Sequence, residues 1–237
     1  MNAYLMCAGN GARLRPLTDS LPKCLLSVRG QPMVSWWLDA IYGSARFDEV
    51  FVNVGHLGDT LIRWIKKYNT ANGTEVRIID EREKLLGTAG TLYWYGDLSE
   101  PFMVAYADTY SWTLFSDLGR FVDLWRDCHQ DVLGCLFSFS VPGDESTALI
   151  KTDFMGTVTS FSEKTADMEG VAWTGVMLAK PDIYKFIRQE DSDLARDVLT
   201  RLVGKTRVIG HVDAYDIGRS VKHYEDFNRQ PQQASKR

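Results

Sequence analysis

A short segment near the start of the chain, residues 7–23 (CAGNGARLRPLTDSLPK), combines two glycines with arginine and lysine side chains. Gly9 and Gly11 lack a Cβ, so the backbone there can adopt positive φ and bring its N–H groups close to an anion. Arg13 offers a planar fork that matches phosphate oxygens, and Lys23 offers a mobile point charge. The segment follows a short apolar run that has the length of a buried strand. These residue types, in this order, predict a phosphate-binding loop.

The prolines of this segment distinguish it from two better-known glycine loops. Pro16 and Pro22 fix φ, remove a donor and disfavour helix at the residue before each of them, so we expect an extended loop. A P-loop requires GxxxxGK[ST], and a dinucleotide fingerprint requires a third glycine that opens a helix. This chain has Leu14 at that third position. The segment therefore argues against a dinucleotide-dependent oxidoreductase.

Two aspartates distant in the sequence are candidates for a functional role. Asp108 follows residues 102–105, an apolar run that predicts a strand buried on both faces. In an open α/β sheet, ligands bind beyond the carboxyl ends of the strands, which favours such a role for Asp108. Asp216 stands in a Tyr-Asp-Ile-Gly segment, residues 215–218. Taken alone, Asp108 could form a turn and Asp216 could cap a helix that begins near Ser220.

Three further segments place polar residues beside glycines or at strand ends. They are residues 85–90 (LLGTAG) with Glu83 or Glu81 before them, residues 161–164 (FSEK) and residues 173–175 (WTG). A glycine at position 87 lets a planar ligand approach the backbone closely. A Glu-Lys pair at a strand end is common on any protein surface, so Glu163 and Lys164 alone carry little information.

Together these segments resemble the signature of the sugar-1-phosphate nucleotidyltransferases, the pyrophosphorylases that make nucleotide sugars. The pattern GxGxRLRPLT followed by Pro-Lys carries most of the resemblance, which extends from residue 3 to about residue 226. It implies an α/β protein with a Rossmann-like mixed, mostly parallel sheet flanked by helices, the GT-A-like nucleotidyltransferase fold. It covers the catalytic domain, without the left-handed β-helix that some relatives append.

The resemblance also implies roles for individual residues. Arg13 and Lys23 are the implied catalytic side chains, and Asp108 and Asp216 are the implied ligands of Mg²⁺. The implied nucleotide contacts are Ala8, Gly9, Gly11, Glu83, Gly87 and Thr88. The implied sugar-phosphate contacts are Glu163, Lys164, Thr174 and Gly175. The chain departs from the family pattern at three places: alanine precedes Asp108, Arg-Ser replaces Thr-Pro after Gly218, and Thr174 replaces asparagine. The last departure leaves the identity of the sugar undetermined.

Composition restricts the remaining possibilities. A chain of 237 residues can bury one large core, and we expect a single catalytic domain over residues 1–229 and a polar tail over residues 230–237. The formal charge of −4, with both signs interspersed, argues against a nucleic-acid partner. No apolar run approaches the roughly 20 residues that span a bilayer and no signal peptide is recognisable, so we expect a cytoplasmic protein without a membrane partner. The cysteines lie far apart and lack CxxC spacing, which favours reduced thiols over disulfides or a zinc site. The histidines show no spacing typical of metal ligands.

Hydrophobic periodicity predicts the order of the elements. Alternating strands and helices in the first half of the chain predict a parallel sheet with crossover helices. The predicted strands there are residues 3–7, 49–54, 75–79, 102–105 and 132–139, with helices over 31–42, from 59, over 91–95 and around 118–128. After Pro142, shorter runs at residues 148–151, 158–162 and 176–179 predict an antiparallel or mixed extension. Helices from Pro181, over 195–202 and from Ser220, with a strand over 206–211, complete the prediction.

The function implied by the resemblance is transfer of a nucleotidyl group from a nucleoside triphosphate to a sugar 1-phosphate, with release of pyrophosphate. We favour GTP with mannose or heptose 1-phosphate, although thymidylyl, uridylyl and cytidylyl relatives share every motif quoted. The alternatives are cytidylyl transfer to phosphocholine and a non-catalytic nucleotide-sugar-binding subunit. The joint presence of Arg13, Lys23, Asp108 and Asp216 argues against the second. The expected partners are the two substrates, and the sequence leaves homo-oligomerisation open.

Overall fold

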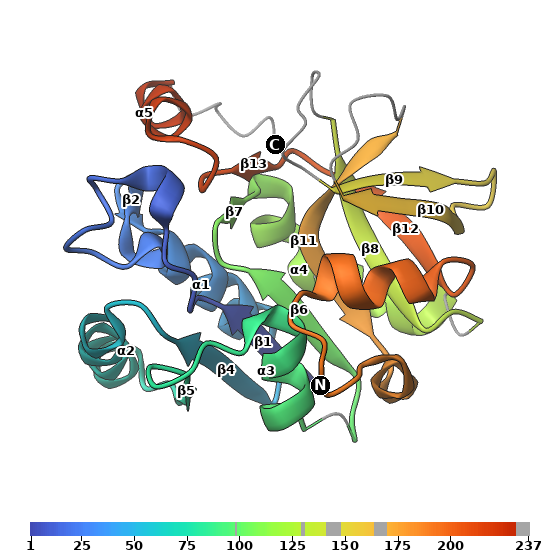
Figure 1. Cartoon of the computed structure of the whole chain (residues 1–237), viewed down its shortest axis with the longest axis horizontal. Helices are drawn as coiled ribbons and strands as arrows, with labels where there is room; N and C mark the ends of the chain where they lie inside the picture. Colours follow the sequence, from blue (N-terminus) through green and yellow to red (C-terminus); the bar gives the residue numbers. More distant parts are fainter. Residues whose placement is uncertain (98, 129–130, 141–147, 164–169, 231–237) are drawn as a thin grey trace.

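A computed structural model of the chain describes residues 1–97, 99–128, 131–140, 148–163 and 170–230. Its centre is a mixed sheet with the strand order β10-β9-β11-β6-β1-β4-β5, extended by β8 and β12 beside β11 (Figure 1). The strands of this sheet are β1 Asn2–Met6, β4 Glu49–Val54, β5 Val76–Asp80, β6 Phe102–Tyr106, β8 Gly134–Phe139, β9 Ala148–Thr152, β10 Val158–Glu163, β11 Val171–Ala179 and β12 Thr206–His211.

The first half of the chain forms the parallel part of the sheet. Strand β1 pairs in parallel with β4 on one side and with β6 on the other, and β4 pairs in parallel with β5. Leu5 therefore lies between Val52 and Ala105. The helices of this half are α1 Met33–Ser44, α2 Gly58–Asn72, α3 Gly87–Tyr95 and α4 Trp112–Cys128. The prediction of parallel strands with crossover helices is confirmed.

The second half adds the antiparallel part that the shorter runs predict. Strand β11 pairs antiparallel with β6, β8 and β9, and β9 pairs antiparallel with β10. β11 begins five residues before the predicted strand and contains an irregularity between Trp173 and Met177, where Gly175 has φ +80°. The alternation of apolar residues breaks at this irregularity, so the first part of β11 does not show the pattern of a strand.

Two hydrophobic cores lie on the two faces of the sheet. The larger contains the apolar side chains of α1, α2 and α4, including Trp37, Leu61 and Val122. The smaller contains α3 and three short helical segments, a 3-10 helix Pro181–Phe186, a π-helical turn Leu194–Val198 and a 3-10 helix Leu199–Leu202. Figure 1 shows α3 and the last two segments on the viewer's side of the sheet. The flanked-sheet architecture predicted from the sequence is confirmed.

Small ribbons at the carboxyl ends of the parallel strands complete the fold. Strands β2 Ser27–Val28 and β3 Gln31–Pro32 form one ribbon, and β7 Thr109–Tyr110 and β13 Tyr215–Asp216 form the other. The last described helix, α5 Val221–Arg229, begins at Ser220, whose hydroxyl accepts a hydrogen bond from the His223 amide. Among the described residues, no helix has the length and apolar character to cross a membrane.

Candidate active site

The loop after β1 passes along one edge of a cavity of about 190 Å³ at the carboxyl end of the parallel strands. Gly9 is exposed, and a Cβ added to it would meet no atom within 4 Å. Gly11 has φ +62°, and its carbonyl oxygen accepts a 2.8 Å hydrogen bond from the Thr18 hydroxyl. A Cβ on Gly11 would lie 2.8 Å from the Thr18 methyl group, so this glycine is required both by its φ and by its neighbour. As the prolines predict, the loop does not run into an α-helix. It is, however, a series of tight turns and not an extended segment: a 3-10 turn over Ala12–Leu14, turns closed by the amides of Leu17 and Asp19, and a second 3-10 turn over Lys23–Leu25.

Asn53, at the end of β4, holds the start of this loop. Its side-chain oxygen accepts hydrogen bonds from the amides of Cys7 and Ala8, at 2.6 and 3.1 Å. Its side-chain nitrogen donates to Glu81 and to Thr91, each at 3.1 Å. The Ala8 amide, predicted to contact a nucleotide, is thus already hydrogen-bonded within the protein. The sequence analysis missed Asn53, although a buried amide within an otherwise apolar run is the signal that could have revealed it.

Lys23 and the two predicted metal ligands come together at one end of this cavity. The Lys23 ammonium forms an ion pair with the Asp108 carboxylate, and both side chains are largely buried. The β7–β13 ribbon sets Asp216 opposite Thr109, the residue that follows Asp108. The carboxylate of Asp216 also accepts a 2.8 Å hydrogen bond from the Gly218 amide. Asp216 therefore does not cap α5, which is capped by Ser220.

Gly218 gives a measure of how closely the charged groups approach. A Cβ added to this glycine would lie 2.6 Å from Asp108 Oδ2, 3.1 Å from Asp216 Oδ1 and 3.0 Å from Lys23 Nζ. The two carboxylate oxygens are therefore under about 6 Å apart. Two oxygens that share one Mg²⁺ at about 2.1 Å are separated by roughly 3 to 4 Å, so a small movement would suffice. Any side chain at position 218 would occupy the space between them.

The electrostatics of this cluster are those of a site with excess negative charge. Burial raises the pKa of Asp108, but the charge and hydrogen bond of Lys23 outweigh burial and hold that pKa below its usual value. Burial and the neighbouring Asp108 carboxylate raise the pKa of Asp216 to about 6. Burial lowers the pKa of Lys23, whereas the Asp108 charge outweighs it and raises that pKa. The positive charge of Arg13, an exposed side chain, also acts to lower the pKa of Lys23, Asp108 and Asp216.

Two carboxylates and one ammonium are the charged groups at the centre of the site. Within the described residues, no three side chains of histidine, cysteine, aspartate or glutamate lie together as a candidate metal cluster. Magnesium is commonly held by one or two carboxylates, with waters and substrate phosphates filling the other positions. The pair Asp108 and Asp216 fits this coordination, because a divalent cation between them would relieve the repulsion that raises the pKa of Asp216.

The opposite wall of the cavity is formed by the start of α3. Gly87 has φ +75°, and a Cβ on it would lie 2.1 Å from the carbonyl oxygen of Ser192. The Thr88 hydroxyl lies 3.1 Å from the Tyr106 hydroxyl and accepts a 2.9 Å hydrogen bond from the Leu194 amide. Gly87 and Thr88 both line the cavity. Close packing against the loop before the π-helical turn is thus one reason for glycine at position 87.

Of the two glutamates before this segment, Glu81 is the one that lines the cavity. Glu81 is buried and accepts hydrogen bonds from the Thr91 hydroxyl at 2.5 Å and from the Leu86 amide at 3.1 Å. Glu83, predicted to contact the nucleotide, is exposed on the loop that precedes α3.

The predicted sugar-phosphate contacts are less closely grouped. The Thr174 side chain is buried and donates to the Phe137 carbonyl at 3.0 Å, while its oxygen accepts from the Val176 amide at 3.2 Å. The Thr174 hydroxyl is thus engaged inside β11, and its contact with a sugar phosphate stays a prediction. At Gly175, a Cβ would lie 3.0 Å from the Tyr106 ring. Glu163 is the last residue of β10, and Lys164 lies outside the described residues.

Comparison with known proteins identifies the family. A family model described as "Nucleotidyl transferase" matches residues 2–227. The chain belongs to the nucleotidyl transferase family. This family member is 26% identical over 220 residues to a UTP–glucose-1-phosphate uridylyltransferase of Synechocystis, covering 86% of the chain and 55% of the relative. It is 25% identical over 221 residues to a probable mannose-1-phosphate guanylyltransferase 2 of Oryza sativa, covering 90% of the chain and 59% of the relative. The chain thus spans little more than half the length of these curated relatives.

Two solved structures show the same fold as this nucleotidyl transferase. HddC from Yersinia pseudotuberculosis has a TM-score of 0.74 at 19% identity, with 95% of this chain and 96% of that chain covered. UDP-glucose pyrophosphorylase complexed with UDP-glucose has a TM-score of 0.77 at 18% identity, with 96% of each chain covered. The predicted Rossmann-like nucleotidyltransferase fold is therefore confirmed.

Proposed function

We propose that this protein transfers a nucleotidyl group from a nucleoside triphosphate to a sugar 1-phosphate and releases pyrophosphate. The observation that carries the proposal is the cluster of Lys23, Asp108 and Asp216 beside the glycine loop, at the carboxyl end of the parallel strands. Family membership supports the same reaction class. The geometry suits a reaction that needs positioning and charge neutralisation rather than a protein nucleophile.

In this proposal an oxygen of the sugar phosphate attacks the α-phosphorus of the triphosphate. The new bond joins the two phosphates, the bond between the α-phosphorus and its bridging oxygen to the β-phosphate breaks, and pyrophosphate leaves with the electron pair. Lys23 moves from Asp108 to the reacting phosphates, since a lysine on a flexible stem can exchange one anionic partner for another. Arg13, exposed at the mouth of the site, holds the triphosphate and offsets the charge that develops on the leaving group.

Asp108 and Asp216 would hold Mg²⁺ in this reaction. The ion would neutralise phosphate charge and polarise the α-phosphate when it is bound. The two carboxylates fit that role because they are partly buried, lie close together and offer only oxygen donors. The remaining assignments are also part of the proposal. The backbone of Gly9, Gly11 and Gly87 would approach the nucleotide, together with Ala8 and Thr88, and Glu83 would contribute from its loop. The contacts to the sugar phosphate would come from Glu163, Lys164, Thr174 and Gly175.

We further propose GTP and mannose 1-phosphate or heptose 1-phosphate as the preferred substrates. Among the relatives, the probable mannose-1-phosphate guanylyltransferase of Oryza sativa supports this choice, and the uridylyltransferase of Synechocystis supports UTP with glucose 1-phosphate as the competitor. A structure of HddC in complex with GMP-PN has the same fold, with a TM-score of 0.74. Specificity of this kind is a difference of transition-state affinities, so it must be measured as a ratio of kcat/KM values.

A pyrophosphate-release screen tests the proposal. Purified protein is incubated with Mg²⁺, each of GTP, UTP, CTP, ATP and dTTP, and each of mannose, heptose and glucose 1-phosphate, with phosphocholine as a further acceptor. We expect release above background for at least one sugar 1-phosphate, with the highest kcat/KM for GTP. Release only with CTP and phosphocholine would replace the proposal with its cytidylyltransferase alternative. Nucleotide-sugar binding without release in any pair would identify a non-catalytic subunit.

A further inference from the structure

The sheet places one strand between the two loops that line the candidate active site. Strand β4 lies between β1 and β5. The chain leaves β1 into the phosphate loop, residues 7–23, and leaves β5 into a second loop, the α3 loop (residues 81–88), which includes the first residues of α3. Both loops line the cavity of about 190 Å³. A side chain at the carboxyl end of β4 can therefore contact both loops at once.

Asn53 makes both of these contacts. Its side-chain oxygen accepts hydrogen bonds from the Cys7 and Ala8 amides of the phosphate loop, at 2.6 and 3.1 Å. Its side-chain nitrogen donates to the carboxylate of Glu81, in the α3 loop, at 3.1 Å. Among side chains of this size, only asparagine offers an acceptor on one side and a donor on the other, since an ionised aspartate cannot donate and leucine can do neither. The residue type thus matches a connection between the two loops.

Glu81 continues this connection to the start of α3. Its side chain is buried, and its carboxylate accepts hydrogen bonds from the Leu86 amide at 3.1 Å and from the Thr91 hydroxyl at 2.5 Å. Leu86 directly precedes α3, so the negative charge of Glu81 lies at the positive end of that helix. Separation of the two loops would leave buried donors and acceptors without partners, which is costly. Two side chains therefore join the phosphate loop to the α3 loop.

We propose that Asn53 and Glu81 are positioning residues that hold the phosphate loop and the α3 loop at the separation required by one nucleoside triphosphate. This inference rests on the proposed function, in which the phosphates lie against the phosphate loop and the base lies against Gly87 and Thr88. A ligand that binds two sites at once gains affinity only if their separation matches its own length. The network would supply that match before the ligand arrives, which lowers the cost of binding.

An exchange of polarity between the two residues tests the connection. Asn53→Asp keeps an acceptor for the phosphate loop but turns a second carboxylate toward Glu81. Glu81→Gln leaves one oxygen where two face donors, so one donor loses its acceptor. In the double variant the new amide can donate to the new carboxylate and accept from the Leu86 amide, and the Thr91 hydroxyl keeps its 2.9 Å hydrogen bond to the Gly87 carbonyl. The exchange also preserves the net charge.

Isothermal titration of the purified protein with GTP and Mg²⁺, without a sugar phosphate, measures the effect. We expect Asn53→Asp and Glu81→Gln each to raise the Kd of GTP about tenfold, and the double variant to lie within about threefold of the wild type. Thr91→Val, a milder variant that removes one donor to Glu81 with little change of shape, should raise it about threefold. The Kd of inorganic tripolyphosphate, which lacks a base, should change by less than about threefold in every variant. UTP is titrated in parallel, and the same pattern is expected with whichever nucleotide binds more tightly.

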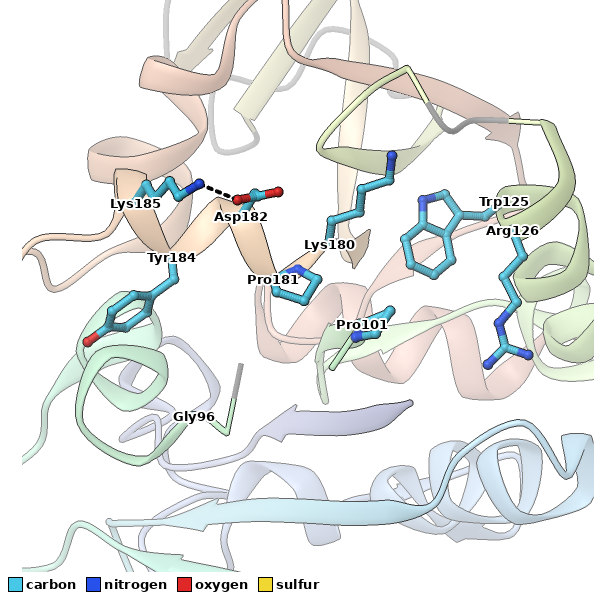
Figure 2. Close-up of a pocket in the computed structure, with 9 residues that line it drawn as sticks. All are labelled: Gly96, Pro101, Trp125, Arg126, Lys180, Pro181, Asp182, Tyr184 and Lys185. Atoms are coloured by element: carbon cyan, nitrogen blue, oxygen red, sulfur yellow. Dashed lines mark hydrogen bonds and ion pairs between the residues drawn. The ribbon is translucent and has the colours of Figure 1, made fainter. Parts of the chain in front are cut away.

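Two control variants separate positioning from stability and from binding elsewhere. Asn69 also accepts a hydrogen bond from a backbone amide, that of Val76 at 3.1 Å, but at the other end of β5. Asn69→Leu should lower the melting temperature without changing the Kd of GTP. A larger cavity, of about 710 Å³, shares no lining residue with the candidate site (Figure 2). Lys185 lines that cavity and is turned toward Asp182 in Figure 2, and Lys185→Gln should leave the Kd of GTP unchanged.

Several results would overturn the inference and leave the proposed function intact. They are an unchanged GTP affinity in all the single variants that fold, equal losses of affinity for GTP and tripolyphosphate, and a double variant that melts like the wild type but binds GTP as weakly as Asn53→Asp. A loss of GTP affinity in Asn69→Leu or Lys185→Gln equal to that in Asn53→Asp would also overturn it. If the wild type binds neither GTP nor UTP, the inference and the proposed function fail together.

Discussion

The backbone amide of Ile217 donates a 2.9 Å hydrogen bond to the carbonyl oxygen of Asp108. This bond, with the pairing of Asp216 and Thr109, fixes the end of β13 against the end of β6. The two carboxylates are consequently neighbours, although half of the chain separates them in the sequence.

The first prediction concerns the two carboxylates. Asp108→Asn or Asp216→Asn keeps the shape of the side chain and removes one negative ligand, so we expect kcat/KM to fall about 10²-fold or more. The double variant should be scarcely worse than either single variant, because the two residues act as one unit. Steady-state pyrophosphate release measures both effects. If the fold-decrease of kcat/KM in the double variant equalled the product of the two single decreases, the two carboxylates would not share one ion.

The second prediction concerns the basic side chains. Arg13→Ala and Lys23→Ala should each lower kcat/KM about 10²-fold, the effect of removing one preorganised partner of a developing charge. The fold should survive in Arg13→Ala, because that side chain is exposed. Lys67→Ala, a change at an exposed lysine of α2, provides the control. Near-normal activity of Lys23→Ala at subsaturating substrate would remove Lys23 from the reaction.

The third prediction separates a glycine required by the fold from one in open space. Gly87→Ala should lower the free energy of unfolding by about 2 kcal/mol or more, since it combines positive φ with a collision at the Ser192 carbonyl. Gly9→Ala should leave the melting temperature nearly unchanged, because its Cβ would meet nothing within 4 Å. Thermal unfolding of both variants provides the comparison. If Gly87→Ala and Gly9→Ala were equally stable, the loop at Ser192 would have to move away from the new Cβ at little cost in free energy.

The fourth prediction concerns pH and the metal-free protein. The pKa of Asp216 is raised from 3.8 to about 6 in the folded state, so the folded protein holds a proton that the unfolded chain has already released. This residue's contribution to stability therefore falls as pH rises from about 4 to 6, by at most about 3 kcal/mol. Asp216→Asn should be more stable than the wild type at pH 7.5 and similar to it near pH 4. Denaturant unfolding in a chelator measures the difference, and a gap of the same size at both pH values would exclude the titration of Asp216 as its cause.

The parts of the fold that depend on local pattern could be predicted from the sequence. Residues 49–54 and 206–211 form strands with the predicted bounds, and Asp108 lies just beyond a buried strand. These features depend on apolar runs and β-branched residues, which are visible without knowledge of neighbours. The helix predicted over residues 195–202 is instead a π-helical turn followed by a 3-10 helix, where the Leu194 amide donates to Thr88 on α3. A contact between distant segments of this kind has no local signature.

In the candidate site, too, features of one continuous segment could be predicted, and contacts between distant segments could not. The glycines, Arg13 and Lys23 predict a phosphate loop because they lie within one short segment of the chain, residues 9–23. The polar Asn53 in an apolar run could be noticed in the sequence, but its partners could not, since its hydrogen bonds reach Cys7, Ala8 and Glu81 from a different strand. The hydrogen bond from the Thr174 hydroxyl to the Phe137 carbonyl, at the backbone irregularity of β11, likewise joins distant segments and has no local signature.

The ribbon of β7 and β13 also determines when the site can exist. During synthesis the glycine loop, Lys23 and Asp108 leave the ribosome together in the first half of the chain. Asp216 follows only after β12, so a nascent chain that has folded its parallel strands still contains one carboxylate of the pair. The pair is completed only when β13 docks onto β7, which requires the chain to have been synthesised beyond residue 216. A chain in which β13 has not docked onto β7 would therefore have only Asp108 of the two carboxylates in place.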